Sequence, residues 1–332
     1  MSRIFIHGTG AVSPAGWGVA ALCEAVKQGV PLPCQDVQRP GWDELLAVRL
    51  VPAPAVRSAF LAHPRLRRAG AMAQHTVGAV LEALGDDVAR VQSGELRLGI
   101  IVCMMAGGVT YSRRFYEEVM KAPETASPLI FPETVFNAPA SHVGAYLGSK
   151  TINYTLVGDN GTVLQGLALG AGWLDSGRAD ACVVIGTEEV DWVVADALRL
   201  FQPRTIYSGG AGAVYLKKAV SDVELKAVTD SFVFTRQQDC VVAARLVRAQ
   251  LPSGSAGELL CDCGSRFADW TGWPGQRLTL KPVLGEAFDA SAAWQCVVAA
   301  HTLHAKEFSA ANISVAGVNQ QAIGARFARN DL

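Results

Sequence analysis

Cysteines are the most reactive side chains in this 332-residue sequence, and their spacing decides which chemistry they can perform. Several of the eight lie in apolar runs such as LGIIVCMM and ADACVVIG, where a buried, reduced thiol is expected. Cys261 and Cys263 are separated by one residue, whereas redox and zinc motifs need two, and nothing nearby completes a metal set. We therefore expect no metal site and no cofactor, and we expect the protein to be located in a reducing cytoplasm.

A second group of polar side chains lies next to predicted helices. Asn160 precedes the glycine-rich stretch Thr162–Leu174, and asparagine is among the best helix N-caps. Each interior glycine costs a helix about 0.5–1 kcal/mol relative to alanine, so we expect this helix to be buried and closely packed. Lys281 and Glu286 are near enough in sequence to form an internal ion pair. No GxSxG or HExxH motif offers another catalytic route.

Short β-branched runs alternate with helical stretches, which predicts α/β layers whose sheets are covered on both sides. The predicted strands form two sets that divide near residue 218: Arg3–His7, Leu96–Met104, Ile152–Val157, Ala181–Gly186 and Ala213–Leu216, then Glu224–Val233, Leu259–Cys263, Leu278–Val283, Ile313–Ala316 and Ala325–Phe327. The predicted helices are Gly18–Gln28, Ala71–Leu84, Thr162–Leu174, Gln237–Leu251 and Ala290–Leu303. The two sets suggest a doubled αβ unit.

The charge balance limits the partners of this protein. The sequence has 29 basic and 30 acidic residues, a formal net charge of −1, and only 18% charged residues. A general nucleic-acid binder needs a basic surface, so we expect no nucleic-acid partner. The longest non-polar run, Leu98 to Val109, is too short to cross a bilayer, and the N-terminus does not read as a signal peptide.

Seven segments of the sequence resemble β-ketoacyl synthases. MSRIFIHGTGAVSPAGWG is similar to the opening strand and glycine loop of that family, and Ser127–Gly148 (SPLIFPETVFNAPASHVGAYLG) to the segment before the active site. Thr151–Glu189 is similar to the strand, nucleophile turn, buried helix and following strand. Ser208–Lys218 (SGGAGAVYLKK) matches the glycine-rich strand that ends the first half, and the later segments CDCGSRFADW, LKPVLGEAFDASAAW and VAGVNQQAIGARF match more thinly.

This resemblance implies the thiolase-like fold, an α/β architecture of two duplicated halves in five layers (αβαβα). The halves would be residues 1–218 and 219–332, packed as one compact unit that dimerises through the strand before the nucleophile. The family acts on acyl groups carried as thioesters on acyl carrier protein. Its condensation uses a cysteine at a helix N-terminus, two histidines that stabilise the enolate, a lysine and a phenylalanine gate.

The residues at those positions differ from the family pattern. Asn160 stands at the cysteine position, Cys263 at the first histidine and Glu286 at the second, while Lys281 is retained. The gate segment 317–321 contains Asn319 and no phenylalanine. A carboxamide cannot accept an acyl group, and a carboxylate destabilises a neighbouring enolate. We therefore expect no catalytic residues for condensation, and we assign Asp159, Phe136 and Asn319 to a possible pocket.

The pattern predicts a ketosynthase-like subunit that resembles a chain-length factor. Such a subunit pairs with an active β-ketoacyl synthase in fatty acid or polyketide biosynthesis. A weaker resemblance suggests a pathway of the aryl-polyene type. Acyl carrier protein is a possible partner, with Arg65, Arg67 and Arg68 as candidate contacts. Two alternatives stay open. One is a thioesterase or acyltransferase that uses Asp159, Cys263 or Glu286, and the other is a homodimer that binds carrier protein.

Overall fold

The computed structural model describes residues 3–262, 272–318 and 320–330. Five strands of the first part of the chain form a sheet in the order β1-β9-β7-β5-β6. β5 is parallel to both β6 and β7, whereas β9 is antiparallel to both β7 and β1. The bounds are β1 Ile4–Ser13, β5 Leu98–Met104, β6 Asn153–Val157, β7 Ala181–Glu188 and β9 Gly210–Lys217.

The second part of the chain repeats this arrangement strand by strand. Its order is β10-β15-β14-β12-β13, with parallel pairing of β12 to β13 and β14 and antiparallel pairing of β15 to β14 and β10. The bounds are β10 Val223–Val228, β12 Glu258–Asp262, β13 Gln276–Thr279, β14 Ala310–Ala316 and β15 Gln321–Arg329. β1 pairs with β10 and joins the two sheets, so the duplication expected from the sequence is present.

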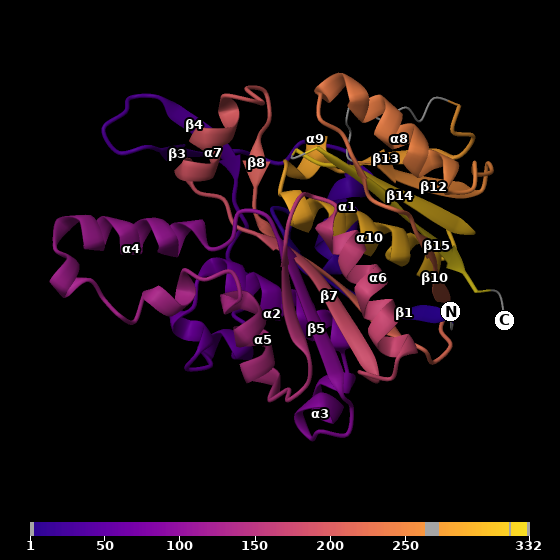
Figure 1. The fold of residues 1–332 in the computed structure, drawn as a ribbon, viewed down its shortest axis with the longest axis horizontal. Coiled ribbons are helices and arrows are strands. Elements are labelled where there is room, and N and C mark those ends of the chain that lie inside the picture. The colour runs from indigo at the N-terminus through magenta and orange to yellow at the C-terminus, as the bar shows by residue number, and fades with distance from the viewer. Residues whose placement is uncertain (1–2, 263–271, 319, 331–332) are drawn as a thin grey trace.

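Helices separate and cover the two sheets, which gives the five expected layers (Figure 1). α2 (Ala71–Leu84) and α5 (Ala138–Leu147) cover the first sheet, and α8 (Cys240–Ala249) covers the second. α6 (Thr162–Asp175) and α10 (Phe288–His304) lie between the sheets. Fourteen of the 17 residues of α10 are buried, as expected for a helix that packs on both sides.

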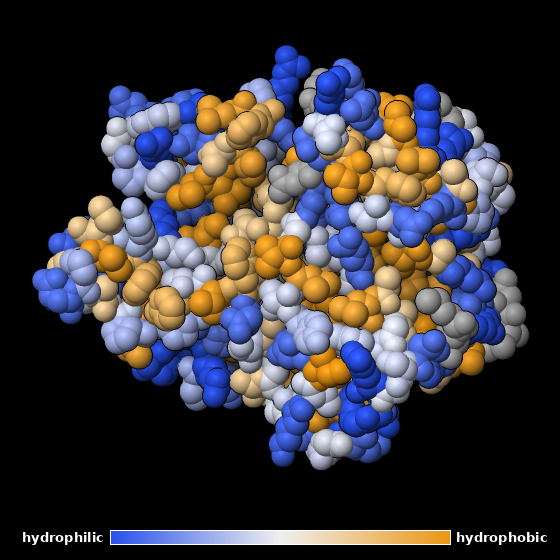
Figure 2. Space-filling view, viewed as in Figure 1, coloured by the Kyte–Doolittle hydropathy of each residue, from blue (hydrophilic) through white to orange (hydrophobic). Residues whose placement is uncertain are grey.

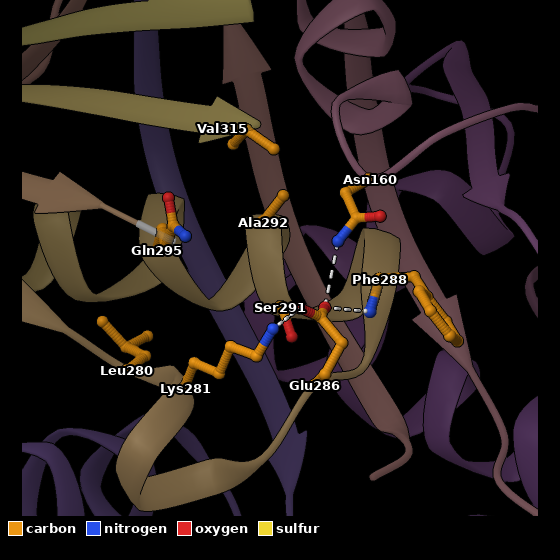
Figure 3. Close-up of a pocket in the computed structure, with 9 residues that line it drawn as sticks. All are labelled: Asn160, Leu280, Lys281, Glu286, Phe288, Ser291, Ala292, Gln295 and Val315. Atoms are coloured by element: carbon orange, nitrogen blue, oxygen red, sulfur yellow. Dashed lines mark hydrogen bonds and ion pairs between the residues drawn. The ribbon is translucent and has the colours of Figure 1, made fainter. Parts of the chain in front are cut away.

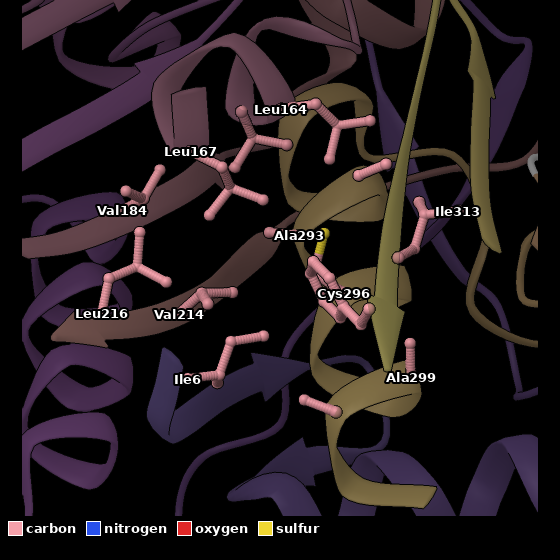
Figure 4. Packing of buried hydrophobic residues seen from close by; sticks show 14 of the residues in the cluster. Ile6, Leu164, Leu167, Val184, Val214, Leu216, Ala293, Cys296, Ala299 and Ile313 are labelled. Atoms are coloured by element: carbon pink, nitrogen blue, oxygen red, sulfur yellow. The ribbon is translucent and has the colours of Figure 1, made fainter. Parts of the chain in front are cut away.

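The central layer is closely packed, as the glycines of α6 predict. A Cβ atom on Gly166 would lie 2.8 Å from Val184 Cγ1 and 2.9 Å from Cys103 Sγ, so only glycine fits there. Leu164 and Leu167 of the same helix pack with residues of both sheets and of α10 in one apolar cluster (Figure 4). Burial of this cluster fixes the start of α6 relative to α10.

Several elements lie outside the layers. A small sheet contains β3 (Gln35–Gln38), β4 (Leu45–Arg49) and β8 (Tyr207–Ser208), and α7 (Trp192–Arg199) packs against it. α4 (Val109–Lys121) projects from the body at the left of Figure 1 and has no buried residue. The remaining helices and strands are β2 Gly16–Trp17, β11 Phe232–Val233, α1 Val19–Gln28, α3 Asp87–Gln92 and α9 Lys281–Leu284, with short 3-10 turns at Ala59–Ala62, Leu66–Arg68, Pro123–Thr125, Phe131–Glu133 and Gln237–Asp239.

One predicted strand is wrong, and most of the others begin or end a few residues away. Instead of one strand over Leu278–Val283, β13 ends at Thr279 and α9 begins at Lys281. Pro282 explains the change, because proline has no N–H for a strand ladder but fits the first turn of a helix. Among the described residues, no helix is both long enough and apolar enough to span a membrane.

Candidate functional site

Asn160 lies in the turn between β6 and α6, and its side chain is buried. Its Nδ2 donates a hydrogen bond to Glu286 Oε1 at 3.0 Å, and its Oδ1 accepts one from Val318 N at 3.4 Å. The residue at the N-cap of α6 is Gly161. The sequence had suggested that Asn160 caps α6, but its carboxamide does not. It links the start of this helix to the second half of the chain.

Glu286 is the centre of the contacts around this carboxamide. Its Oε1 also accepts a hydrogen bond from Phe288 N at 2.8 Å, and its Oε2 lies 3.0 Å from Lys281 Nζ (Figure 3). The ion pair suggested by the sequence is thus present. The backbone of Glu286 is held as well, because its N–H donates to Ile206 O and its carbonyl accepts from Ser208 N, both at 2.8 Å. Phe288 has a φ of 46°, an uncommon value for a bulky residue.

A very small cavity lies beside these three side chains. Its volume is about 10 Å³, which is room for about one water molecule. Nine residues line it: Asn160, Leu280, Lys281, Glu286, Phe288, Ser291, Ala292, Gln295 and Val315 (Figure 3). A cavity of this volume does not accommodate an acyl chain.

Carboxyl groups occupy the backbone amides at the start of α6. Asp159 Oδ1 accepts from Asn160 N at 2.9 Å, and Asp289 Oδ1 accepts from Val163 N at 2.9 Å. Burial raises the pKa of Asp289 well above its usual range, with a further contribution from Glu188. A reactive thiolate depends on free amides and on positive potential at a helix N-terminus. Here acidic side chains accept hydrogen bonds from these amides and offset the positive potential, so the site would not stabilise a thiolate.

Two buried glutamates at the end of β7 belong to the same acidic region, and sequence reasoning missed them. Glu188 accepts hydrogen bonds from Met105 N and from Ala106 N, the latter at 3.1 Å, and Glu189 accepts one from Thr110 N at 2.6 Å. Burial raises the pKa of Glu188 to about 8 and that of Glu189 to about 7. The signal in the sequence is two adjacent acids directly after an apolar strand.

The structure brings together only part of the predicted site. Asn160, Lys281 and Glu286 meet at the cavity, whereas Asp159 does not line it and instead accepts a hydrogen bond from Gln321 N at 3.0 Å. Phe136 does not line it either, because its side chain lies at the surface against Gly107. The predictions for Cys263 and Asn319 fall outside the described residues.

Comparison with known proteins gives its result at the level of structure. No family model matches the sequence, and no curated protein matches it. A chain of AntDE:AntF, a type II PKS acyl-carrier protein in complex with its ketosynthase bound to the hexaketide, aligns with a TM-score of 0.81 and 16% identity over 99% of each chain. The ishigamide ketosynthase/chain length factor aligns with a TM-score of 0.78 and 17% identity, over 98% of this chain and 99% of that one.

This chain has the ketosynthase fold. A β-ketoacyl synthase from Burkholderia phymatum STM815 agrees, with a TM-score of 0.77 and 13% identity over 99% of this chain and all of that one. The alignments extend over nearly the whole length of these ketosynthase chains, so both duplicated halves are included. Identities this low establish the ketosynthase fold alone, and the activity must be argued from the site.

Proposed function

We propose that this protein is a non-condensing, ketosynthase-like subunit that pairs with an active β-ketoacyl synthase, in the manner of a chain-length factor. The observation that carries the proposal is the Asn160 carboxamide at the start of α6, hydrogen-bonded to a glutamate that is itself paired with a lysine. A carboxamide held in this way is not a nucleophile. Glu286 also places a carboxylate where condensation chemistry needs hydrogen-bond donors.

The contacts of the carboxyl groups disfavour a hydrolase or acyltransferase. A general base must face the proton that it removes, within hydrogen-bond distance. Asp159 instead accepts from Asn160 N and Gln321 N, and Glu286 accepts from Asn160, Phe288 and Lys281. The cavity of about 10 Å³ beside them has room for about one water molecule and none for an acyl thioester.

An open sheet edge and an apolar arm support a partner subunit. β6 is the last strand of the first sheet, and Tyr154 and Val157 on it are about half exposed. We define the arm as residues 109–136, which include α4 and carry the exposed side chains Tyr116, Met120, Leu129, Phe131 and Phe136. Figure 2 shows apolar residues along this arm, at the left of the view. Open edges and apolar patches are typical of surfaces that another chain covers.

A cluster of arginines supports acyl carrier protein as a second partner. Arg57, Arg65, Arg67 and Arg68 are exposed, and none of them forms an ion pair with any part of the chain that the structure describes. Unpaired arginines attract acidic surfaces and accelerate their binding. We propose that an acidic carrier protein contacts this cluster while its acyl chain is elongated by the partner synthase.

Native mass spectrometry of the protein, alone and co-expressed with the ketosynthase from the same gene cluster, tests the proposal. We expect a one-to-one complex, and malonyl-dependent elongation that requires the ketosynthase. Acyl transfer or elongation by the isolated protein would contradict the non-condensing assignment. A stable homodimer that does not exchange with the ketosynthase would replace it by a homodimeric carrier-protein binder.

A further inference from the structure

Helix α7 contacts both the arm and a β-hairpin to which the proposed function gives no role. We define the hairpin as residues 35–49, in which β3 and β4 pair antiparallel. Figure 1 shows the hairpin, α7 and α4 on the same side of the molecule, at the left of the view. A continuous series of cation–π contacts connects these elements, through Arg39 and Trp42 of the hairpin, Arg113 of α4, and Trp192 and Arg199 of α7.

Arg113 connects the arm to the first turn of α7. Its Nε donates a hydrogen bond to Asp191 Oδ2 at 2.7 Å, and its Cζ lies 5.8 Å from the centre of the Trp192 ring. Asp191 is also the N-cap of α7, because its Oδ1 accepts a hydrogen bond from Trp192 N at 2.5 Å. Both members of the Arg113–Asp191 pair are partly buried, so this pair is less screened than one on an open surface.

Arg39 connects the hairpin to the same helix. Its Nη1 donates a hydrogen bond to Asp196 Oδ2 at 3.0 Å. Its Cζ lies 4.7 Å from the centre of the Trp42 ring and 5.9 Å from that of Trp192. Arg199 repeats these contacts from α7 itself, since its Nε donates to Asp196 Oδ1 at 2.7 Å and its Cζ lies 4.9 Å from the Trp42 ring. The hairpin is therefore held to α7 by both charge and aromatic contacts.

Trp192 is the residue that the two sides share. Its ring packs in one apolar cluster with Leu46 and Val48 of the hairpin. One guanidinium group from the hairpin and one from the arm are both attracted to this ring, at 5.9 Å and 5.8 Å from its centre. A displacement of either group alters the surroundings of the ring, and residues that share a contact have non-additive energies.

We propose that the arm and the hairpin form one cooperative unit, coupled through Trp192 and α7, so that local opening of either segment favours opening of the other. Proteins open locally in such units, and here the unit joins segments from different parts of the chain. A molecule that binds the arm would therefore also stabilise the hairpin. The coupling is a property of the isolated chain, so it does not depend on the proposed function.

Hydrogen exchange of the isolated protein tests the coupling. Arg113→Met removes the contacts of the arm with α7 and changes no residue of the hairpin. We expect it to accelerate exchange of the hairpin amides by about threefold, as the loss of a partly exposed cation–π contact would. Arg39→Met should accelerate exchange of the α4 amides to a similar extent, because a coupling acts in both directions. With Trp192→Leu also present, Arg113→Met should no longer affect the hairpin.

Arg114→Met is the matched control for the arm. Arg114 is the next residue on α4, its side chain is 60% exposed, and it lies 3.6 Å from Glu118 of the same helix. This variant should leave exchange of the hairpin amides unchanged. The amides of α10, in the central layer, are an internal reference and should exchange at the wild-type rate in every variant.

Four results would overturn the inference. In the first, Arg113→Met accelerates the arm and leaves the hairpin unchanged, so that the two segments open independently. In the second, Arg114→Met accelerates the hairpin as much as Arg113→Met does. In the third, the effect on the hairpin persists with Trp192→Leu. In the fourth, the amides of α10 accelerate equally, which would indicate global unfolding. If Trp192→Leu does not fold, the two arginine variants and the control decide the question.

Discussion

Glu286 contacts three neighbours at once, and this arrangement sets the consequence of removing any one of them. The carboxylate is almost fully buried, while the Lys281 side chain is 31% exposed. Loss of the lysine leaves a buried negative charge with only neutral hydrogen-bond donors. The loss of stability then comes mainly from the uncompensated charge of the buried carboxylate that remains, and less from the missing contact itself.

We expect Lys281→Met to lower the free energy of unfolding at neutral pH by about 1–2 kcal/mol, since partial exposure of the lysine moderates the loss of a buried pair. Adding Glu286→Gln should restore most of this stability, because the uncompensated charge disappears. Chemical denaturation of both single variants and the double variant measures the coupling. Lys150→Met, at an exposed lysine, is the control and should be neutral. Additive effects of Lys281→Met and Glu286→Gln would contradict the assignment.

Asn160→Cys should not restore a reactive nucleophile. The introduced thiol would face Glu286, and Asp159 and Asp289 already occupy amides at the start of α6, so its pKa should be raised rather than lowered. We expect its alkylation by iodoacetamide to be at least about tenfold slower than that of the exposed Cys34, which is an internal reference in the same protein. Glu286→Gln in the same variant should increase the rate. Alkylation as fast as that of Cys34 would disprove this account.

At the scale of elements, the base of the arm depends on buried acids. Glu188 holds the backbone of Met105 and Ala106 in the connection between β5 and α4, and Glu189 holds Thr110 in the first turn of α4, which itself buries no residue. Asp191 and Arg113 also face Glu189, and Glu286 and Asp289 face Glu188. The arm is therefore held at its base by groups whose charge changes near neutral pH.

The two glutamates should make this connection looser as the pH rises. Their folded pKa values of about 7 and about 8 exceed the ordinary glutamate value of 4.5, so their contribution to stability is full below that value, declines as the pH rises above it, and is lost once the pH has passed 7 to 8. We expect hydrogen exchange of amides 105–110, corrected for the intrinsic rate, to accelerate between about pH 5 and pH 8 and to level off above it. Glu189→Gln should flatten this dependence, whereas Glu117→Gln, partly exposed on α4, should not.

At the scale of the whole molecule, the proposed partner surface consists of β6 and the arm. Parallel pairing with β5 uses one edge of β6, and no strand among the described residues pairs with the other edge. Tyr154 also packs edge-on against Trp173 of α6, so the strand is anchored to the body without a partner. A substitution at an exposed β6 position should thus change assembly and leave the fold intact.

Val157→Lys should abolish the proposed complex with the ketosynthase while the thermal stability of the isolated chain stays within about 1 °C of wild type, as surface changes usually do. Val157 is the last residue of β6, and its side chain is 54% exposed. Val233→Lys is the matched control, since Val233 is 75% exposed on β11 in the other half. Native mass spectrometry should detect the complex for the control and not for Val157→Lys. If both variants form the complex equally well, the interface with the ketosynthase does not include Val157 of β6.

The sequence by itself determined the α/β layers and the duplicated order, because buried strands and the glycine-rich helix α6 carry strong local patterns of apolar residues. The resemblance of its motifs to those of β-ketoacyl synthases also identified Asn160, Glu286 and Lys281 as candidate site residues. The sequence did not predict α4, an amphipathic helix that buries none of its residues against the rest of the chain.

Only the tertiary structure decided how those residues act. Asn160 and Glu286 are 126 positions apart, and their hydrogen bond exists because α6 and α10 pack in the same central layer. Glu188 acquires its role from the backbone of a segment 82 residues earlier. The cavity exists because residues from distant parts of the chain, among them Asn160, Phe288 and Val315, line it together. Such contacts depend on how distant segments pack, and local sequence patterns carry no information about that packing.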